Sequence, residues 1–282
     1  MNIQWFPGHM AKTRRLIEEN LKLVDICVEI IDARLVNSSK SPLVDELIEG
    51  KPRLLVVNKS DLADERVNKL WENYFRENKI NAIFLNSRDG GKLVNLISGK
   101  ITAILSDEIK KWNEKGMSGR NIRAMVTGVP NVGKSTFINN ISGKKSAKTG
   151  DRPGVTTGKQ WIRAGKIEML DTPGILCPKF DDEQMGLNLA FSGAIKDDIY
   201  DKGEVSVLLL EFLRDNYPDA LKERYKIDFD EEEKGYEILE KICRKRGFVL
   251  RGGDFDYERA ASVLLDEFRS AKICRVSLEK PL

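Results

Sequence analysis

Short apolar runs alternate with amphipathic segments along the first 175 residues of the chain. The apolar runs are rich in Val, Ile and Leu, and the segments 64–78 and 92–112 carry apolar residues at helical spacing. This alternation is typical of a parallel sheet that is covered by helices. We predict strands at 26–31, 54–57, 82–85 and 122–127, and a strand pair at 160–163 and 167–170.

The alternation ends near Pro178, and beyond this point apolar residues recur at helical spacing. Helices are predicted around 205–213 and 236–243, and a third is predicted to follow Asp254 or Asp256 as its cap. The apolar face of this third helix consists of Tyr257, Ala260, Ala261, Leu264 and Phe268. The pattern predicts an α/β domain at 1–180 and a smaller, all-helical domain at 181–282.

Composition places the chain among ordinary globular proteins, because 41% of its 282 residues are hydrophobic and 32% are charged. No apolar run approaches the roughly 18 residues of a membrane-spanning helix, and the first 15 residues contain no signal-peptide-like stretch. We therefore expect a cytoplasmic protein with neither membrane nor DNA among its partners. Its cysteines are too scattered for a zinc site or a disulfide framework, and we expect reduced thiols at Cys27, Cys177, Cys243 and Cys274.

The net charge of +3 conceals two electrostatically different halves. Residues 1–180 carry 30 basic and 20 acidic residues, whereas residues 181–282 carry 17 basic and 24 acidic ones. Within these halves, residues 120–164 hold nine basic residues and one acid, and residues 241–282 hold ten basic residues against six acids. Basic segments of this kind indicate a polyanionic partner, although a solvated surface explains the second segment equally well.

A phosphate-binding loop is predicted at Gly128-Val-Pro-Asn-Val-Gly133-Lys134-Ser135, between the strand at 122–127 and a helical segment. In such loops backbone N–H groups surround the phosphates, the lysine reaches the β- and γ-phosphates, and the serine hydroxyl ligates Mg²⁺. The loop indicates a nucleoside triphosphate without indicating which one. We expect nucleotide contacts from Asn131, Val132, Gly133, Lys134, Ser135 and Thr136.

The string Asn58-Lys59-Ser60-Asp61 follows a predicted strand, at the carboxyl end where open α/β sheets bind their ligands. Asp61 can accept hydrogen bonds from N1–H and the exocyclic amine of guanine, Asn58 can meet the base from its other edge, and the Lys59 stem can cover its face. Adenine presents an acceptor at N1 and would leave the Asp61 carboxylate unpaired. The string therefore favours GTP over ATP.

A weaker base contact is predicted at Asn86 and Ser87, which follow the strand at 82–85. A backbone N–H or the serine hydroxyl at this place would contact guanine O6. An ordinary turn over the polar and glycine-containing residues 86–91 explains the same sequence equally well.

Sensing of the γ-phosphate is predicted at Asp171-Thr-Pro-Gly174, after the strand at 167–170. Asp171 can hold Mg²⁺ through a water molecule, and the Gly174 N–H can reach the γ-phosphate. Between this motif and the phosphate loop lies Thr156, whose hydroxyl is our candidate ligand for Mg²⁺, with Thr157 as the second choice. In ordinary GTPases these motifs precede Asn-Lys-x-Asp, whereas here Asn58 comes first, which predicts a circularly permuted GTPase domain.

Three strings make the chain resemble the circularly permuted GTPases of the YlqF type. They are Trp5-Phe-Pro-Gly-His9-Met10, Asp32-Ala-Arg34 and Asp171-Thr-Pro-Gly-Ile175. The resemblance is close in the GTPase half and looser in the tail, where it implies a helical domain that contacts RNA. It implies GTP hydrolysis coupled to late assembly of the bacterial large ribosomal subunit, with rRNA and ribosomal proteins as partners.

The resemblance also implies how this chain activates water. Ile175 stands where many small GTPases have a glutamine that orients the attacking water, and its side chain cannot form a hydrogen bond. In the family the histidine corresponding to His9, which lies on a Pro–Gly turn here, takes the catalytic role. Asn131 matches the asparagine through which potassium-activated relatives coordinate K⁺, although from residue type alone it could equally cap the loop.

Two other functions compete with an RNA-directed GTPase. The first is a GTP-dependent switch that binds a protein, with incidental hydrolysis and with the helical domain as the recognition module. The second is a P-loop kinase, which the string at 58–61 disfavours because a kinase would leave it unexplained. We also expect the segment after Gly174 to couple the nucleotide state to the helical domain.

Overall fold

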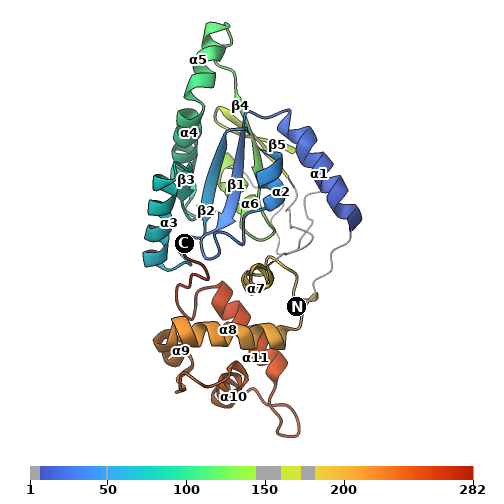
Figure 1. Cartoon of the computed structure of the whole chain (residues 1–282), viewed down its shortest axis with the longest axis vertical. Coiled ribbons are helices and arrows are strands. Elements are labelled where there is room, and N and C mark those ends of the chain that lie inside the picture. Colours follow the sequence, from blue (N-terminus) through green and yellow to red (C-terminus); the bar gives the residue numbers. More distant parts are fainter. Residues whose placement is uncertain (1–6, 49, 144–159, 173–181, 282) are drawn as a thin grey trace.

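The computed structural model describes residues 7–48, 50–143, 160–172 and 182–281; the side chains of residues 7–13, 92 and 160 are not described. Figure 1 shows a sheet flanked by helices, with a group of helices beyond one end of the strands. The strands are β1 (Ile26–Asp32), β2 (Arg53–Asn58), β3 (Ala82–Phe84), β4 (Ile122–Thr127), β5 (Gln160–Ala164) and β6 (Ile167–Asp171). All six strands agree with the predicted ones to within one residue at either end.

The sheet has the strand order β3-β2-β1-β4-β6-β5, and only β5 runs antiparallel to its neighbour. The chain proceeds outward from β1 to β3 on one side and then returns to β4 on the other side of β1. The central strand β1 is buried along its whole length, as expected for a parallel sheet covered on both faces. The point between β1 and β4 is therefore the topological switch of an open α/β sheet.

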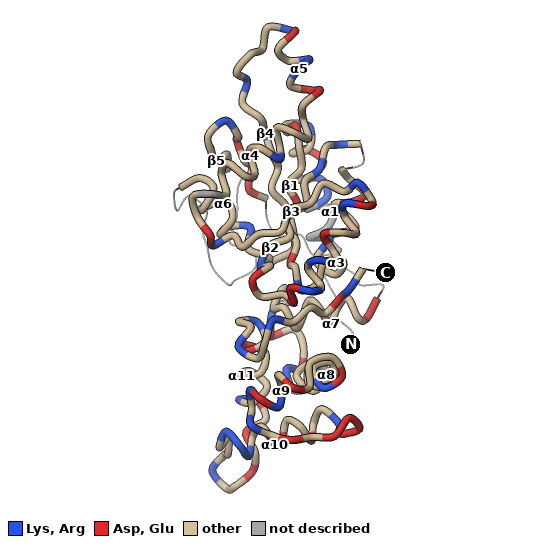
Figure 2. Tube along the Cα trace, turned by 90° about the vertical axis from the view of Figure 1, so that its left-hand side faces the viewer, with Lys and Arg blue, Asp and Glu red and all other residues tan. Residues whose placement is uncertain are grey.

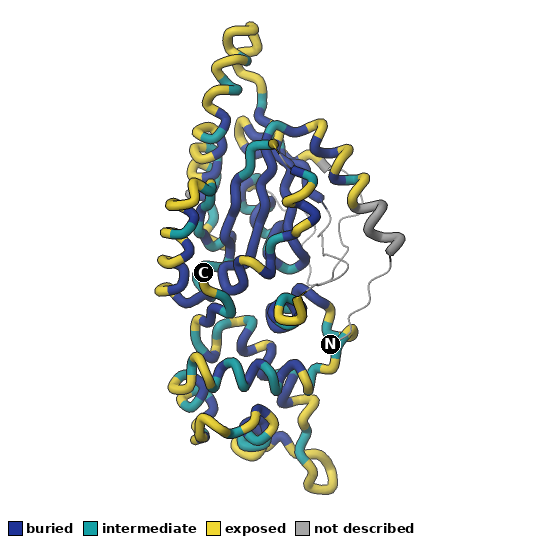
Figure 3. Tube along the Cα trace, in the orientation of Figure 1, coloured by how far each residue is buried: buried dark blue, intermediate teal, exposed yellow. Residues whose placement is uncertain are grey.

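The two faces of the sheet bury alternate residues of each strand, because successive side chains point to opposite sides. Ile26, Val28 and Ile30 of β1 pack with α4 (Leu93–Ile104) and α6 (Lys134–Ser142). Cys27 packs with α1 (Pro7–Leu21) and α2 (Pro42–Leu47), and Ile31 packs with α3 (Glu65–Glu77). Figure 3 shows this buried sheet between partly exposed helices.

Two local predictions about helices are wrong. The segment 92–112 is not one helix: a 3-10 turn η1 (Gly90–Lys92) precedes α4, and α5 (Ser106–Glu114) follows after Leu105. Leu105 is fully buried whereas α5 buries no residue, so the first helix ends where the chain leaves the core. His9 lies in helix α1 rather than on a turn, because Pro7 is tolerated at the first helical position.

Helices follow the sheet and share a core of their own. They are α7 (Glu183–Ser192), α8 (Lys202–Asn216), α9 (Pro218–Tyr225), α10 (Gly235–Arg246) and α11 (Tyr257–Arg269). Asp256 rather than Asp254 caps α11, since its side chain accepts a hydrogen bond from Arg259 N. None of the helices in the described ranges is long and apolar enough to cross a membrane.

The chain returns to the sheet after α11. Val276 N donates to Leu62 O over 3.2 Å, and Leu278 N donates to Arg34 O over 2.7 Å. The Glu279 carboxylate accepts from the N–H groups of Asn37 and Ser38. The residues that follow the helices are thus fixed to the loops after β1 and β2. Cys27 and Cys243 are buried free thiols, Cys274 is half-buried and free, and Cys177 lies outside the described residues.

Candidate functional site

The predicted motifs meet at one edge of the sheet. Asn58 is the last residue of β2, Asp171 is the last residue of β6, and the loop that begins at Gly128 directly follows β4. These strands are parallel to β1, so their carboxyl ends lie on the same side. This edge adjoins the switch between β1 and β4, where open α/β sheets bind their ligands.

Two glycines are required for the phosphate loop to adopt its shape. Gly128 has a φ of +146°, and a Cβ there would lie 2.2 Å from the carbonyl oxygen of Ile30. Gly133 has a φ of +99°, and a Cβ there would lie 2.4 Å from Asn58 Nδ2. Any other residue at either position would clash with a neighbouring segment. The loop therefore lies directly against β1 and against the string that begins at Asn58.

Lys134 begins α6 and is 9% exposed. Its Nζ donates to the carbonyl oxygens of Gly128 and Val129, each over 3.0 Å. Burial lowers the pKa of its ammonium group to about 8, although the nearby Asp171 opposes this shift. The positive charge is thus held inside the loop, beside the helix N-terminus, where a phosphate would gain most from it.

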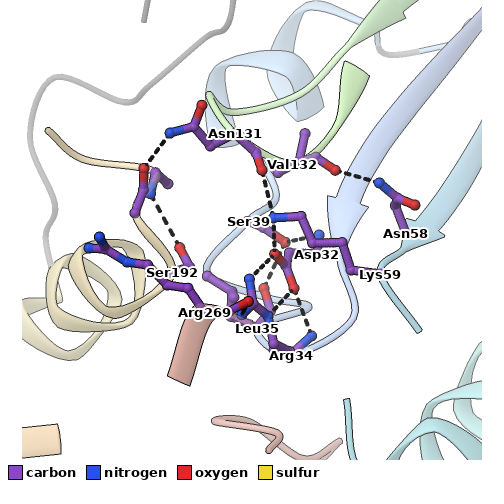
Figure 4. Close-up of polar contacts among 12 residues, drawn as sticks. Asp32, Arg34, Leu35, Ser39, Asn58, Lys59, Asn131, Val132, Ser192 and Arg269 are labelled. Atoms are coloured by element: carbon purple, nitrogen blue, oxygen red, sulfur yellow. Dashed lines mark hydrogen bonds and ion pairs between the residues drawn. The ribbon is translucent and has the colours of Figure 1, made fainter. Parts of the chain in front are cut away.

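Asn58 ties two loops together, and Figure 4 shows its contact with Val132 in one of them. Its Nδ2 donates to Val132 O over 2.6 Å, and its Oδ1 accepts from Ser87 N over 2.8 Å. The amide is buried and both of its ends are engaged. Asn58 therefore fixes residues 58–61 against the phosphate loop.

Two buried oxygen atoms beside this junction have no hydrogen-bond partner in the described part of the chain. They are Oδ1 of Asp61 and Oγ of Ser87. An unsatisfied buried acceptor is costly, and it marks a place where a ligand with matching donors gains affinity. Asn86 contributes differently, because its Oδ1 accepts from Arg88 N over 2.9 Å and closes a local turn. This contact agrees with the ordinary turn over residues 86–91, which was the alternative to a base contact for Asn86.

Lys59 and Asn131 connect residues 58–61 to the phosphate loop, and both have a left-handed backbone with a φ of +59°. Lys59 Nζ donates to Asn131 O over 2.6 Å and to Asp32 Oδ2 over 2.9 Å (Figure 4). Asn131 Nδ2 donates to Gly193 O over 2.6 Å, at the end of α7. Non-glycine residues in this conformation cost free energy and are concentrated at functional sites.

The predicted magnesium ligands are only partly described. Ser135 and Thr136 stand in the first turn of α6, and Asp171 is 4% exposed at the end of β6. Thr156, Thr157, Gly174 and Ile175 lie outside the described residues, and so does the side chain of His9. Within the described ranges, no group of three or more His, Cys, Asp or Glu side chains is placed to hold a metal ion. A Mg²⁺ ion would thus depend on a few oxygen ligands and on nucleotide phosphates, which is its usual mode.

Sequence reasoning did not include Asp32 and Arg34 among the site residues. Asp32 ends β1, both residues are 1% exposed, and Arg34 Nε and Nη2 donate to the carboxylate over 2.9 Å and 2.8 Å. Burial alone would raise the pKa of the Asp32 carboxyl, but Arg34 and Lys59 hold it well below its usual range. The sequence did carry a signal for this site, because Asp32 is a charged residue directly after the predicted strand at 26–31, at the same sheet edge as Asn58.

The chain matches the family model described as 50S ribosome-binding GTPase over residues 123–237. Ribosome biogenesis GTPase A from Bacillus cereus is 47% identical over 282 residues, which cover 100% of this chain and 95% of that protein. The chain belongs to the ribosome biogenesis GTPase A family. It is a GTPase that acts in ribosome biogenesis.

Solved structures of this family share the fold. GDP-bound TM YlqF aligns with a TM-score of 0.69 at 27% identity, over 95% of this chain and 99% of that one. GNP-bound YlqF from T. maritima aligns with a TM-score of 0.68 at 26% identity, over 96% and 98%. The predicted α/β P-loop GTPase fold with permuted motif order and helices after the sheet is confirmed. The family model begins at residue 123, after Asn58, as this permuted order requires.

Proposed function

We propose that this GTPase acts in late assembly of the bacterial large ribosomal subunit, and that GTP and GDP bind between the phosphate loop and residues 58–61. The observation that carries the nucleotide site is the Asn58 amide, which holds both loops while leaving the Asp61 oxygen free for a base. The 50S ribosome-binding description of the matching family model supports the choice of subunit. Because bacterial ribosomes assemble in the cytoplasm, we propose that it acts there.

A basic surface on the helices supports an rRNA partner. Exposed Arg244, Lys245 and Arg246 end α10, and exposed Arg251 and Arg259 follow them. Figure 2 shows these basic residues gathered at the end of α10, away from the acidic residues near its start. Such a cluster favours phosphate contacts. The residues at 181–282 thus form our proposed ribosome-contacting domain, and those at 1–180 the GTP-binding domain.

One basic residue of the tail serves a different purpose. Arg269 donates through Nη2 to Ala190 O and to Asp197 Oδ1, over 3.0 Å and 2.8 Å. Its Nε donates to Phe191 O over 3.1 Å. Arg269 therefore holds the end of α7 against α11 and is not part of the basic surface.

The end of α7 supports coupling between the nucleotide state and the helices. Asn131 of the phosphate loop donates to Gly193 O there (Figure 4), and Arg269 holds Phe191 O just before it. The helix itself begins at Glu183, nine residues after Gly174 of the predicted γ-phosphate motif. We propose that changes in this motif on hydrolysis move α7 and, through it, the remaining helices.

Mg²⁺ is proposed as the cofactor because the oxygen donors fit it. The hydroxyl of Ser135, in the first turn of α6, is proposed as a direct ligand, and the carboxylate of Asp171, at the end of β6, is proposed to hold the ion through a water molecule. The hydroxyl of Thr156 is proposed as a further ligand. When bound, Mg²⁺ would neutralise charge on the β- and γ-phosphates. Gly174 N–H is proposed to contact the γ-phosphate, and Asn86, Ser87, Val132, Gly133 and Thr136 to line the nucleotide.

A potassium ion is proposed at Asn131, whose amide nitrogen is engaged with Gly193 while its amide oxygen is the available ligand. GTP turnover by the natural chain should be roughly tenfold faster in KCl than in NaCl at equal concentration, about 1.4 kcal/mol of barrier. In Asn131→Ala this difference should disappear while GDP affinity stays within a few-fold. Turnover assays in both salts test this, and a variant that retains potassium stimulation would contradict the assignment.

His9 is proposed to orient the attacking water, because Ile175 cannot do so and no other histidine exists in the chain.

The proposed function is tested by measuring GTP turnover by the protein alone, with large ribosomal subunits and with small ones. We expect stimulation of roughly tenfold or more by large subunits only. Binding to large subunits should be tighter with a non-hydrolysable GTP analogue than with GDP, as coupling requires.

Variants of His9 and of the basic surface test the individual parts of this proposal. His9→Ala should reduce the stimulated turnover and leave GTP affinity nearly intact. Replacement of Arg244, Lys245 and Arg246 by glutamine should weaken subunit binding and lower its salt slope by roughly 2 to 3. The matched control replaces three exposed lysines far from the basic surface, which are Lys110 and Lys111 of α5 and Lys115 directly after it. Turnover that only a protein partner stimulates would instead favour the protein-binding switch.

A further inference from the structure

The Asp32 carboxylate accepts four hydrogen bonds beside the proposed nucleotide site. It accepts from Arg34 N, Arg34 Nε, Arg34 Nη2 and Lys59 Nζ, over 3.1, 2.9, 2.8 and 2.9 Å. All of these atoms belong to loops at the carboxyl ends of β1 and β2, and Asp32 itself is buried. A buried carboxylate that is paired with two cations has a fixed position and fixes its partners in turn.

Lys59 is the partner that reaches the nucleotide site. Its ammonium lies between Asp32 Oδ2 and the phosphate-loop carbonyl of Asn131, and both contacts are shorter than 3 Å. Anchoring the end of a lysine side chain also determines the course of its methylene stem. That stem is the part proposed to cover the guanine face, so this inference rests on the proposed placement of Lys59.

Arg34 holds Asp32 from the opposite side and is not available to the nucleotide. Its Nη1 donates to Arg269 O over 3.2 Å, and its guanidinium lies 5.5 Å from the centre of the Phe268 ring. Arg34 is thus fixed by α11, while Lys59 retains 22% side-chain exposure. Arg34 therefore supports the Asp32 carboxylate rigidly on one side, and Lys59 on the other side remains partly accessible.

We propose that Asp32 is a positioning residue for guanine nucleotide binding, which acts by holding the Lys59 ammonium against the phosphate loop and the Lys59 stem over the base. Asp32 touches neither the phosphates nor the attacking water in this arrangement. Its loss should weaken binding of nucleotide di- and triphosphates equally and leave the chemical step unchanged.

The test is a double-mutant cycle on the full chain, with GDP dissociation constants and GTP turnover as readouts. Asp32→Asn should raise the GDP dissociation constant about 10- to 30-fold and the KM for GTP by a similar factor, with kcat changed less than about twofold. Lys59→Met, which keeps the stem and removes the ammonium, should weaken GDP binding by a similar factor. The double variant should bind GDP no more weakly than Lys59→Met alone.

Glu29→Gln is the matched control for a buried charge lost from the same strand. Glu29 is fully buried and its carboxylate accepts from Arg53 and from Ser41 N, at contacts outside the nucleotide loops. This variant should lower the melting temperature without changing the GDP dissociation constant. A structural role for Asp32 would make Asp32→Asn behave in the same way.

Several outcomes would overturn the proposal. GDP affinity within twofold of the natural chain for a folded Asp32→Asn would do so, as would an equal loss in both Lys59 backgrounds. If Asp32→Asn alone does not fold, the double variant decides, because it removes one charge of each sign. A tenfold weaker affinity than Lys59→Met would then contradict the proposal. If Lys59→Met itself leaves GDP binding unchanged, the proposed base site fails instead.

Discussion

Lys134→Met should weaken GTP and GDP binding by about 100- to 1,000-fold, which corresponds to about 3–4 kcal/mol. The Lys134 ammonium is buried, and its two hydrogen-bond acceptors are the neutral carbonyls of Gly128 and Val129. Phosphate oxygens would provide the negative charge that these carbonyls lack. Without the ammonium, the phosphates would enter a buried loop with one charge partner fewer.

The same burial predicts that Lys134→Met changes the stability of the folded chain only slightly. Burial penalises the charged form of Lys134 and lowers its pKa to about 8, so its removal relieves a cost in the nucleotide-free chain. We expect the melting temperature without nucleotide to fall by no more than about 3 °C. Titration with a fluorescent GDP derivative and thermal unfolding measure both effects.

Lys100→Met is the control, because this lysine is exposed on α4 and carries the same charge. It should leave both GDP affinity and stability unchanged. A Lys134→Met chain that binds GDP within threefold of the natural chain would show that the phosphates lie elsewhere.

Asp61→Asn should reverse the base preference of the enzyme from guanine towards xanthine. The buried Oδ1 of Asp61 has no partner among the described residues, and guanine would bring two donors to this carboxylate. An asparagine amide presents a donor in place of one acceptor, which suits the carbonyl of xanthine and opposes the exocyclic amine of guanine. We expect GTP affinity to fall about 100- to 1,000-fold and XTP to become the better substrate.

Competition between GTP and XTP in binding and turnover assays measures this change. Asp64→Asn is the matched control three residues further along the chain. Asp64 caps α3 by accepting from Arg66 N, and asparagine caps helices equally well. This control should keep both the base preference and the stability, whereas an Asp61→Asn chain that still prefers GTP would refute the base assignment.

The central part of the fold is predictable from the sequence because its strands are distinct in composition. The predicted strand at 122–127 has the same bounds as β4, and Asn58 and Asp171 directly follow predicted strands. Parallel strands place such residues at one sheet edge, whatever their order along the chain. The permuted motifs can therefore be brought together from the positions of these strands alone.

The remaining features depend on contacts between distant segments. The short helix α2 buries only Leu43 and Val44, which is too few residues for a helical period. In the sequence Arg269 is indistinguishable from the other basic residues of the tail, because its role depends on the carbonyls at the end of α7 to which it donates. The contact between Asp32 and Lys59 joins residues 27 positions apart and becomes visible only when β1 and β2 are paired.

Residues 58–61 and 128–135 are proposed to bind opposite ends of one guanine nucleotide. A crystal structure of the full chain with GDP and Mg²⁺ tests it most directly. We expect the guanine N1–H within hydrogen-bonding distance of the Asp61 carboxylate and a β-phosphate oxygen within that distance of Lys134 Nζ. A base bound away from Asp61 while the phosphates occupy the loop, or GDP bound elsewhere on the chain, would contradict the claim.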